Sequence, residues 1–486
     1  MNIKQYFVGA WLAGAMMMGL GACTSVPENA TQVNQLPKLY PDYVGVTVPT
    51  QIAPLDFGMV DDGVETIDVV IKGSKTGELH SNGDYADFDI DEWHNLLEQN
   101  KGGKLSVTVS TEKDGKWTQY KDFDIHVSPY ALDDWGLTYR RIAPGYEVYG
   151  KLGIYQRNLS NFEETAILEN TAAPGACLNC HTANRTNPDQ FTFHVRGDHG
   201  ATLVSQNGKR EWLKAKNDSL KGSMVYPYWH PSGKYCAYST NTTHQSFHAN
   251  ADKRLEVYDS KSDVYVADLD NNRIISSPLI SDSTHLETFP TFSPDGKYVY
   301  YCVANRKGLE STNLKGLKYS LVRIPFDEKT GSFGTEVDTL YKERSVCHPK
   351  ISPDGRYCLF TVADYGTFPI WHPEADLYML DLQTGKVDSL SVVNSEKSDT
   401  YHSWSHTGRW FVFASKRDDG LYGKPYFCYV DRQGKAHKPF VLPQREPTFY
   451  DDCLKSFNIP ELSRGPVPFD AIDIENVMKQ EAEKFK

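Results

Sequence analysis

Four stretches of this sequence align with one another, and they constrain the fold more than any other feature. They are YPYWHPSGKYCAYS (226–239), FPTFSPDGKYVYYC (289–302), HPKISPDGRYCLFT (348–361) and YHSWSHTGRWFVFA (401–414). In each, an extended segment runs into a Gly-containing turn, and an aromatic-rich segment follows. Turns of this composition join antiparallel strands, so each stretch predicts a β-hairpin. The shared glycines, Gly233, Gly296, Gly355 and Gly408, lie 63, 59 and 53 residues apart.

A second hairpin follows each of the first four. We place these second hairpins at 263–274, 318–331, 375–387 and 425–436. Two successive hairpins make a four-stranded sheet, and repeats of roughly 40–60 residues built in this way are typical of β-propeller blades. An open row of unrelated hairpins is the alternative. Such a row leaves strand edges unpaired, whereas a closed ring of blades removes that liability.

The Ser-Pro-Asp-Gly units at 293–296 and 352–355 resemble the propeller repeats of the periplasmic translocation protein TolB and its relatives. Four copies are clear, and weaker ones at 150–168 and 191–214 bring the expected number of blades to six. The resemblance covers at most residues 136–442, and it implies the fold. The segment before it does not resemble the amino-terminal domain of TolB, so the translocation role and partners of TolB are not implied.

The expected fold class is mainly β, with a six-bladed TolB-like β-propeller preceded by a small β-sandwich-like domain. Residues 55–130 alternate apolar and polar side chains, as half-buried strands do. A helical segment at 89–101 interrupts them, with Asp89 or Asp91 as its N-cap. Residues 443–486 predict an irregular return strap and then a short charged helix in solvent.

The amino terminus predicts export and a lipid anchor. The apolar run from Tyr6 to Leu20 suits a signal peptide and is short for a membrane span. It ends in Leu-Gly-Ala-Cys, which resembles the lipobox of bacterial lipoproteins, whose cysteine is acylated. We therefore expect a signal peptide at 1–22, a lipid on Cys23, and a tether and linker at 23–54. An ordinary secretory signal that contains a cysteine is the alternative.

Residues Cys177-Leu178-Asn179-Cys180-His181 match C-x-x-C-H, the attachment motif of c-type haem. The two thiols add to the vinyl groups of one porphyrin, and the adjacent histidine ligates the iron. With nine cysteines and fifteen histidines in the chain, chance would produce roughly 0.005 such motifs. Export makes haem attachment permissible. We expect one covalent haem c on Cys177, Cys180 and His181, in a segment inserted into the propeller at 171–190.

Three alternatives explain the same cysteine pair. A thioredoxin-like redox pair needs a βαβ context, and the surroundings here are rich in Pro, Asn and Thr. A zinc knuckle needs a second ligand pair. A disulfide across so short a loop is strained. The remaining cysteines fall mostly in strand-like runs, where we expect buried free thiols: Cys236, Cys302, Cys347, Cys358, Cys428 and Cys453.

The opposite face of the iron needs a ligand or stays open. In FTFHVRGDHG, alternation along a strand places Thr192, His194 and Arg196 on one face. We expect His194 to be the second iron ligand and Arg196 to pair with a haem propionate. A half-buried histidine with an ordinary hydrogen bond is the alternative for His194. His199 and Met224 are the other candidate ligands.

A second group of polar residues lies just before, or at the start of, the innermost strand of each predicted blade. Such positions line the central channel of a propeller, where ligands bind. Solvated loop residues are the alternative. The candidate mouth residues are His285, Glu287, His348, Asp399 and His402. A loop at 242–254, which carries His244 and His248, could cover that mouth. One repeat position is shared by Tyr226, Phe289, His348 and Tyr401, so we expect a ring of polar and aromatic groups at one mouth.

The expected function is electron transfer by one haem c on a rigid scaffold in a bacterial cell envelope, on its periplasmic or cell-surface side. The alternatives are a binding or assembly module with a structural or sensory haem, and a haem oxidoreductase. No catalytic constellation names a reaction. Expected partners are the membrane, through the lipid, and a redox protein or envelope component. Net charge is −12 and no basic run stands out, so nucleic acid is not an expected partner.

Overall fold

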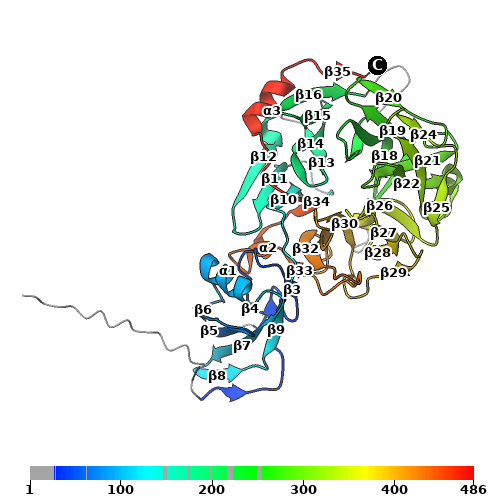
Figure 1. The fold of residues 1–486 in the computed structure, drawn as a ribbon. Helices are drawn as coiled ribbons and strands as arrows, with labels where there is room; N and C mark the ends of the chain where they lie inside the picture. Colours follow the sequence, from blue (N-terminus) through cyan, green and yellow to red (C-terminus); the bar gives the residue numbers. More distant parts are fainter. Residues whose placement is uncertain are drawn as a thin grey trace, which may run out of the picture.

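A computed structural model of the chain describes residues 27, 29–61, 63–145, 150–172, 176–197, 200–215, 223–248 and 254–485. Two units are visible in Figure 1: a small domain from the first part of the chain and a larger ring of sheets. The predicted signal peptide, Cys23 and His199 lie outside the described residues. Within them, no helix combines the length and the apolar character that crossing a membrane requires.

The larger unit is a six-bladed β-propeller, which confirms the predicted mainly β fold (Figure 1). One inner strand of each blade lies next to the inner strands of its two neighbours, and together the six form a ring. The inner strands are β13 (Cys177–Asn184), β17 (Val225–Trp229), β21 (His285–Phe292), β26 (Ser345–Ile351), β30 (Asp399–Trp404) and β34 (Ser456–Ser463).

The other strands follow outward in antiparallel order within each blade. They are β10 (Gly136–Ile142), β11 (Gly153–Asn158) and β12 (Glu164–Glu169); β14 (Asn187–Arg196), β15 (Ala201–Gln206) and β16 (Lys209–Lys214); β18 (Tyr235–Phe247), β19 (Leu255–Asp268) and β20 (Arg273–Ile275); β22 (Tyr298–Asn305), β23 (Ser320–Asp327), β24 (Ser332–Phe333) and β25 (Asp338–Tyr341); β27 (Tyr357–Ala363), β28 (Asp376–Asp381) and β29 (Val387–Asp388); and β31 (Trp410–Ser415), β32 (Lys424–Tyr429) and β33 (Phe440–Val441).

The first blade joins the two ends of the propeller. Its outer strands come from residues 136–169, whereas its inner strand is β34, which pairs antiparallel with β10 from Gly136↔Ser463 to Ile142↔Ser456. The predicted strap is therefore partly wrong, because it contains the strand that closes the ring. SFNIPELS carries Pro460 and lacks the turn signature of the repeats, and it becomes a strand through pairing with a distant segment.

Each inner strand has one residue with left-handed backbone, at φ between 47° and 54°. All six of these residues coincide with an irregularity in the pairing to the next strand of the same blade. The six residues are Cys180, Tyr226, Phe289, His348, Tyr401 and Ile459, named here the bulge ring. It contains the four residues that share a repeat position and adds two. The C-x-x-C-H motif is therefore part of an inner strand, and its predicted placement in an inserted loop is wrong.

The small domain differs in detail from the predicted sandwich. One seven-stranded sheet combines β5 (Thr66–Gly73), β6 (Glu78–Gly83), β7 (Lys104–Lys113), β8 (Lys116–Gln119), β9 (Phe123–Val127), β1 (Thr31–Gln32) and β3 (Thr47–Val48), and β2 (Leu39–Tyr40) pairs separately with β4 (Gly58–Met59). Helix α1 (Ile90–Gln99) contacts β5 and β6, where a second sheet was expected. The Asp89 side chain caps this helix, as predicted, by accepting from the backbone N–H groups of Asp91 and Glu92.

Two segments expected to be solvated belong to the fold. Residues 23–54 were predicted as tether, but Tyr43, Val46 and Val48 are fully buried in the core of the small domain. Near the other end, helix α3 (Ala471–Met478) buries Ile474 and contacts β12 and β16. The helix α2 (Phe449–Asp452) and the strand β35 (Glu483–Lys484) complete this part of the chain.

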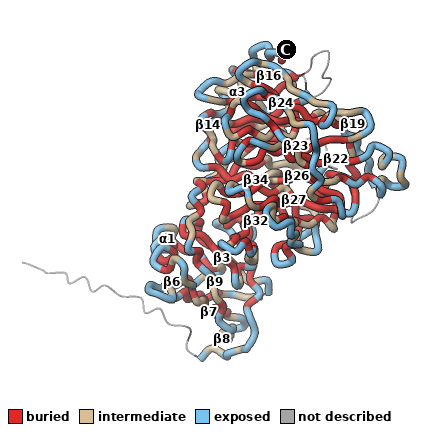
Figure 2. The backbone as a smooth tube through the Cα atoms, turned by 45° about the vertical axis from the view of Figure 1, so that its right-hand side comes forward, coloured by how far each residue is buried: buried red, intermediate tan, exposed pale blue. Residues whose placement is uncertain are grey.

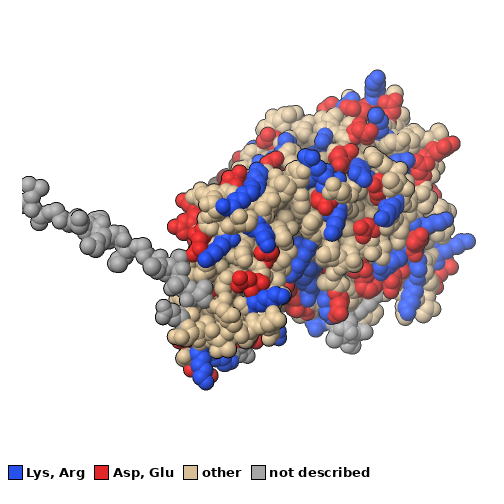
Figure 3. Space-filling view, turned by 60° about the horizontal axis from the view of Figure 1, so that its bottom comes forward, with Lys and Arg blue, Asp and Glu red and all other residues tan. Residues whose placement is uncertain are grey.

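Buried residues are concentrated in the sheets and exposed ones in the turns, as Figure 2 shows. All eight described cysteines are free thiols. Basic and acidic side chains are interspersed over the face shown in Figure 3. Basic side chains also line two cavities inside the propeller, at the two ends of its central channel.

Candidate functional site

The central channel has two mouths separated by a narrow waist. A cavity of about 450 Å³ lies where the inner strands begin, and we name it the strand-start mouth. A second cavity, of about 320 Å³, lies where the inner strands run into the repeat turns, and we name it the turn-side mouth. The waist between them holds only about 40 Å³ and is lined by the bulge ring.

Aromatic rings close the waist. The ring centroids of Tyr226 and Phe289 are 4.4 Å apart, those of Phe289 and His348 4.0 Å, and those of His348 and Tyr401 4.9 Å. The residues that share one repeat position were expected at a mouth, but the structure places them at this constriction. The two mouths are therefore separate sites.

The strand-start mouth combines basic, aromatic and aliphatic groups. Among its described lining residues none is acidic, although the chain has a net charge of −12. Its basic residues are Arg140, Lys151, Arg196 and Lys416, and its aromatic residues are Tyr226, Phe368, Trp371 and Tyr401. A concave apolar wall with a few fixed cations suits a flat ligand that carries negative charge at its edge.

Two of these cations are held by neighbours in the wall itself. The Lys416 ammonium lies 4.4 Å from the centroid of the Trp371 indole, and burial lowers its pKa to about 8 against the opposing charge of Asp419. Arg140 donates to the side-chain oxygen of Asn179 over 2.5 Å and to the carbonyl of Leu178 over 3.3 Å. Lys151 pairs with Glu169 at 2.9 Å, outside the cavity. Lys416 and Arg140 are thus held in place by the blades around the mouth.

The first cysteine of the motif lies in this mouth. Cys177 is half-buried and lines the cavity together with Asn179 and Arg196. Arg196 is directly across from Cys177 in the β13–β14 pairing, so both side chains project from the same face of the blade. Cys180 lies deeper, in the bulge ring at the waist. Burial raises the pKa of its thiol, while the nearby Arg196 acts in the opposite direction.

The histidine of the motif does not face this mouth. His181 is 2% exposed, and its ring stacks on the buried Phe191 with centroids 6.1 Å apart. Neither ring nitrogen makes a hydrogen bond of good geometry within the described residues, although the backbone of Thr138 lies close. Burial lowers the pKa of His181 to about 3, so the ring is neutral. Cys177 and His181 therefore point in different directions.

The expected second iron ligand does not reach the mouth either. His194 is 5% exposed and its Nδ1 lies 2.9 Å from the hydroxyl of Thr202. It shares a blade face with Arg196, as strand alternation predicts. Its partner across the strands is Asn179, which lines the mouth, whereas His194 does not. Of the other candidates, Met224 is buried in the core of a blade.

Replacing His194 by Ala should therefore lower stability. The change leaves a buried Thr202 hydroxyl without its partner, which costs about 1–3 kcal/mol. We expect a lower midpoint in urea unfolding, with the visible absorption of the protein unchanged. Thr202→Val removes the other partner of the same bond and serves as the matched variant. An unchanged midpoint with a new absorption spectrum would instead place His194 on an iron.

Only two of the five candidate mouth residues reach the channel. His348 and His402 line the waist, and Nε2 of His402 is 2.9 Å from the carbonyl oxygen of Leu359. Asp399 is fully buried in an ion pair with Arg417 at 3.1 Å. His285 and Glu287 lie at the start of β21 and line none of the three channel cavities. Side chains alternate along each inner strand, so many of them point toward a neighbouring blade and not into the channel.

The predicted covering loop is instead an extended hairpin. Strands β18 and β19 pair as far as Phe247↔Leu255, and Thr243 and Gln245 line the strand-start mouth. His244 stacks on Tyr258, with centroids 5.3 Å apart, and does not line the cavity. The hairpin therefore forms one wall of the mouth.

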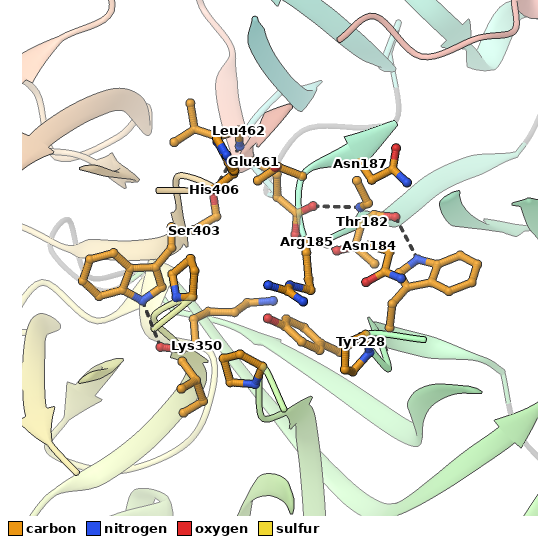
Figure 4. A pocket seen from close by; sticks show the side chains of 18 of the residues that line it. Thr182, Asn184, Arg185, Asn187, Tyr228, Lys350, Ser403, His406, Glu461 and Leu462 are labelled. Atoms are coloured by element: carbon orange, nitrogen blue, oxygen red, sulfur yellow. Dashed lines mark hydrogen bonds between the residues drawn. The ribbon is translucent and has the colours of Figure 1, made fainter. Parts of the chain in front are cut away.

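The turn-side mouth, which Figure 4 shows, was not predicted from the sequence. The side chains of Lys350, Arg185 and Tyr228 point toward its centre, and the Lys350 ammonium is 4.5 Å from the Tyr228 ring centroid. Glu461 accepts from the Thr182 hydroxyl (3.0 Å) and the backbone N–H of Ala183 (3.2 Å). Burial raises the pKa of Glu461 and lowers that of Lys350, and each opposes the shift of the other.

A periodic signal could have found this second site. Tyr228, Lys350 and Glu461 each lie two residues after a member of the bulge ring, so they form a second ring along the channel. This two-residue spacing could be recognised for Tyr228 and Lys350, because both lie in the aligned repeats at 226–239 and 348–361. It was hidden for Glu461, because β34 has no repeat signature.

Comparison with known proteins shows no matching family model and no matching curated protein. Solved structures that are similar to this chain include an oligogalacturonate lyase in complex with manganese (12% identity, 62% of this chain and 72% of that chain, TM-score 0.38). A prolyl endopeptidase is 13% identical over 70% of this chain and 41% of that chain, with a TM-score of 0.34. An apocarotenoid oxygenase from Synechocystis is 11% identical over 86% and 95%, with a TM-score of 0.37.

Proposed function

We propose that this protein is an envelope lipoprotein that carries one haem c in its strand-start mouth and transfers electrons. The observation that carries the proposal is the lining of that mouth, which joins Cys177 to four basic residues without a described carboxylate. A haem is a flat apolar ring with two carboxylates at one edge, and it matches this combination. The lipid on Cys23 belongs to the same proposal.

Specific residues would hold the group. Cys177 and Cys180 supply the thiols for covalent attachment. Arg196 and Arg140 stand where charge-assisted hydrogen bonds to propionates would form, and Trp371 and Tyr401 offer ring contacts. A bound haem supplies one-electron transfer, and the chain fixes its place and exposes one edge.

The fit is incomplete at the iron. The thiol of Cys177 and the cations suit a haem in this mouth. Cys180, however, lies at the waist, and the imidazoles of His181 and His194 do not reach the mouth. Ligation by His181 requires its ring to leave Phe191 and part of β13 to leave its sheet. In this conformation the chain therefore offers groups for attachment and for recognition of the propionates. Neither histidine is assigned as an iron ligand.

That misfit favours a second candidate function. In it, the propeller is a binding or assembly module, and the strand-start mouth takes an anionic group of an envelope partner without covalent attachment. The same cations would recognise the group. This candidate needs no movement of β13.

Titration with haemin tests recognition by the mouth. Protein made in a host without haem-attachment machinery should bind haemin, and Arg196→Gln should weaken binding by about tenfold, the loss expected for one charge-assisted hydrogen bond. Arg185→Gln changes an exposed arginine at the turn-side mouth and is the matched control. Absorption in the Soret region gives the dissociation constants.

Equal affinity in the two variants would contradict the assignment of haemin to the strand-start mouth. Weaker binding in Arg185→Gln alone would place the ligand at the turn-side mouth. An absence of haemin binding in the wild type would remove the support for a haem at either mouth and favour the binding module.

A further inference from the structure

A cluster of three potential metal ligands lies at the start of β21, outside both mouths. Asp282, His285 and Glu287 each offer a coordinating atom, and these atoms lie within 4.8 Å of one another. Asp282 is in the loop that leads from the third blade into the fourth, whereas the other two residues belong to the strand itself. None of the three takes part in the proposed haem site.

One carboxylate oxygen of the buried member of the cluster has no hydrogen-bond partner among the described residues. Glu287 is 2% exposed, and its Oε2 makes no hydrogen bond within the part of the chain that the structure describes. A buried carboxylate that is neither paired nor fully hydrogen-bonded is costly, and a bound cation would remove that cost.

The other two ligands are held in position by their neighbours. Oδ1 of Asp282 accepts from the hydroxyl of Thr284 (2.6 Å) and the backbone N–H of His285 (3.1 Å), and its Oδ2 lies 2.7 Å from Nδ1 of His285. A second carboxylate, Asp263, accepts from the Ser281 hydroxyl over 2.9 Å and so ties the loop to β19. Orientation of this kind is typical of residues around metal ligands.

The cluster is also open to solvent on one side. The side chains of His285 and Asp282 are 39% and 34% exposed, so an ion can enter past them. The nearest basic groups are directed elsewhere. Arg306 reaches the carbonyl of Ser283 over 3.5 Å, and Lys261 pairs with Asp263 at 3.7 Å.

We propose that Asp282, His285 and Glu287 bind one divalent transition-metal ion, with Zn²⁺ as the first choice. Two carboxylates and one imidazole suit Zn²⁺ or Mn²⁺, whereas Ca²⁺ and Mg²⁺ prefer oxygen ligands alone and Cu⁺ prefers sulfur. Two ligand atoms of a tetrahedral zinc ion are about 3.4 Å apart, so a pair that is 4.8 Å apart must close by about 1.4 Å as the ion binds. Three protein ligands leave a coordination position for water.

The test compares Zn²⁺ binding by metal-free full-length protein and two variants, measured by isothermal titration calorimetry. We expect one strong site in the wild type and a loss of affinity of at least about tenfold in Glu287→Gln. His80→Ala is the matched control, because it removes an imidazole that lies 2.7 Å from a carboxylate oxygen of Asp68 in the small domain. It should bind Zn²⁺ as the wild type does.

Thermal unfolding without metal separates a lost ligand from a lost fold. Glu287→Gln replaces a buried carboxyl group by an amide of the same shape, so its midpoint should be no lower than that of the wild type. Added Zn²⁺ should raise the wild-type midpoint and leave that of Glu287→Gln unchanged. Equal Zn²⁺ affinity in wild type and Glu287→Gln, or no binding by the wild type, would overturn the proposal.

Discussion

A chain that ends at Leu442 should not form the propeller. The deletion removes β34, so β10 loses its inner neighbour and the ring of inner strands is left open. Phe457 and Leu462 are fully buried. Removing side chains of this kind costs about 2–5 kcal/mol each, which is comparable with the whole stability of a domain, about 5–15 kcal/mol. We expect the truncated protein to be insoluble or to lack a cooperative thermal transition.

A shorter deletion is the control. Removing residues 480–486 takes away β35, which pairs with the outer strand β16, and leaves the ring of inner strands intact. That protein should fold with a reduced thermal midpoint. A soluble chain ending at Leu442, with the wild-type circular dichroism spectrum and midpoint, would contradict closure by β34.

Much of the propeller could be predicted because four blades carry the same local signal. The turns at Gly233, Gly296, Gly355 and Gly408 all join an inner strand to the next strand outward. The helix α1 was equally local, with its cap at Asp89. Where turn chemistry and side-chain periodicity agree, sequence alone is sufficient.

Strands that depend on distant pairing were missed. Cys177–Asn184 carries few apolar residues and no repeat signature, so it was expected to be a loop. Its strand conformation depends on pairing with β14 and on contact with β17 and β34. Ser456–Ser463 has the same character and pairs with a strand more than 300 residues earlier. Such pairings are set by ring closure.

The site was predictable in part. Strand alternation predicted that His194 and Arg196 share one strand face, and Arg196 does line the cavity that Cys177 also lines. Whether a residue faces the channel or a neighbouring blade depends on the left-handed residue in each inner strand. That irregularity turns Cys180 to the waist and directs His181 away from Cys177. The sequence of the motif alone does not indicate this irregularity.

Changing both motif cysteines should abolish covalent haem. In a host with haem-attachment machinery, the wild type should retain haem stain after denaturing electrophoresis, because thioether bonds survive denaturation. Cys177→Ser combined with Cys180→Ser should retain none. The fold should persist in this variant, because neither thiol is in a disulfide and serine is close to cysteine in size.

Cys453→Ser is the matched control, because Cys453 is also a half-buried free thiol and lies outside the motif. It should keep the full haem stain. Retention of stain in the double variant, or its loss in Cys453→Ser, would exclude attachment through the motif.

The mass of the intact, denatured polypeptide tests the central claim most directly. Protein purified from a host with haem-attachment machinery should be heavier than the processed polypeptide and its lipid by the mass of one haem. The double cysteine variant should lack this increment. A wild-type mass that equals the polypeptide with its lipid alone would contradict the haem carrier and leave the strand-start mouth as a site for a non-covalent anionic partner.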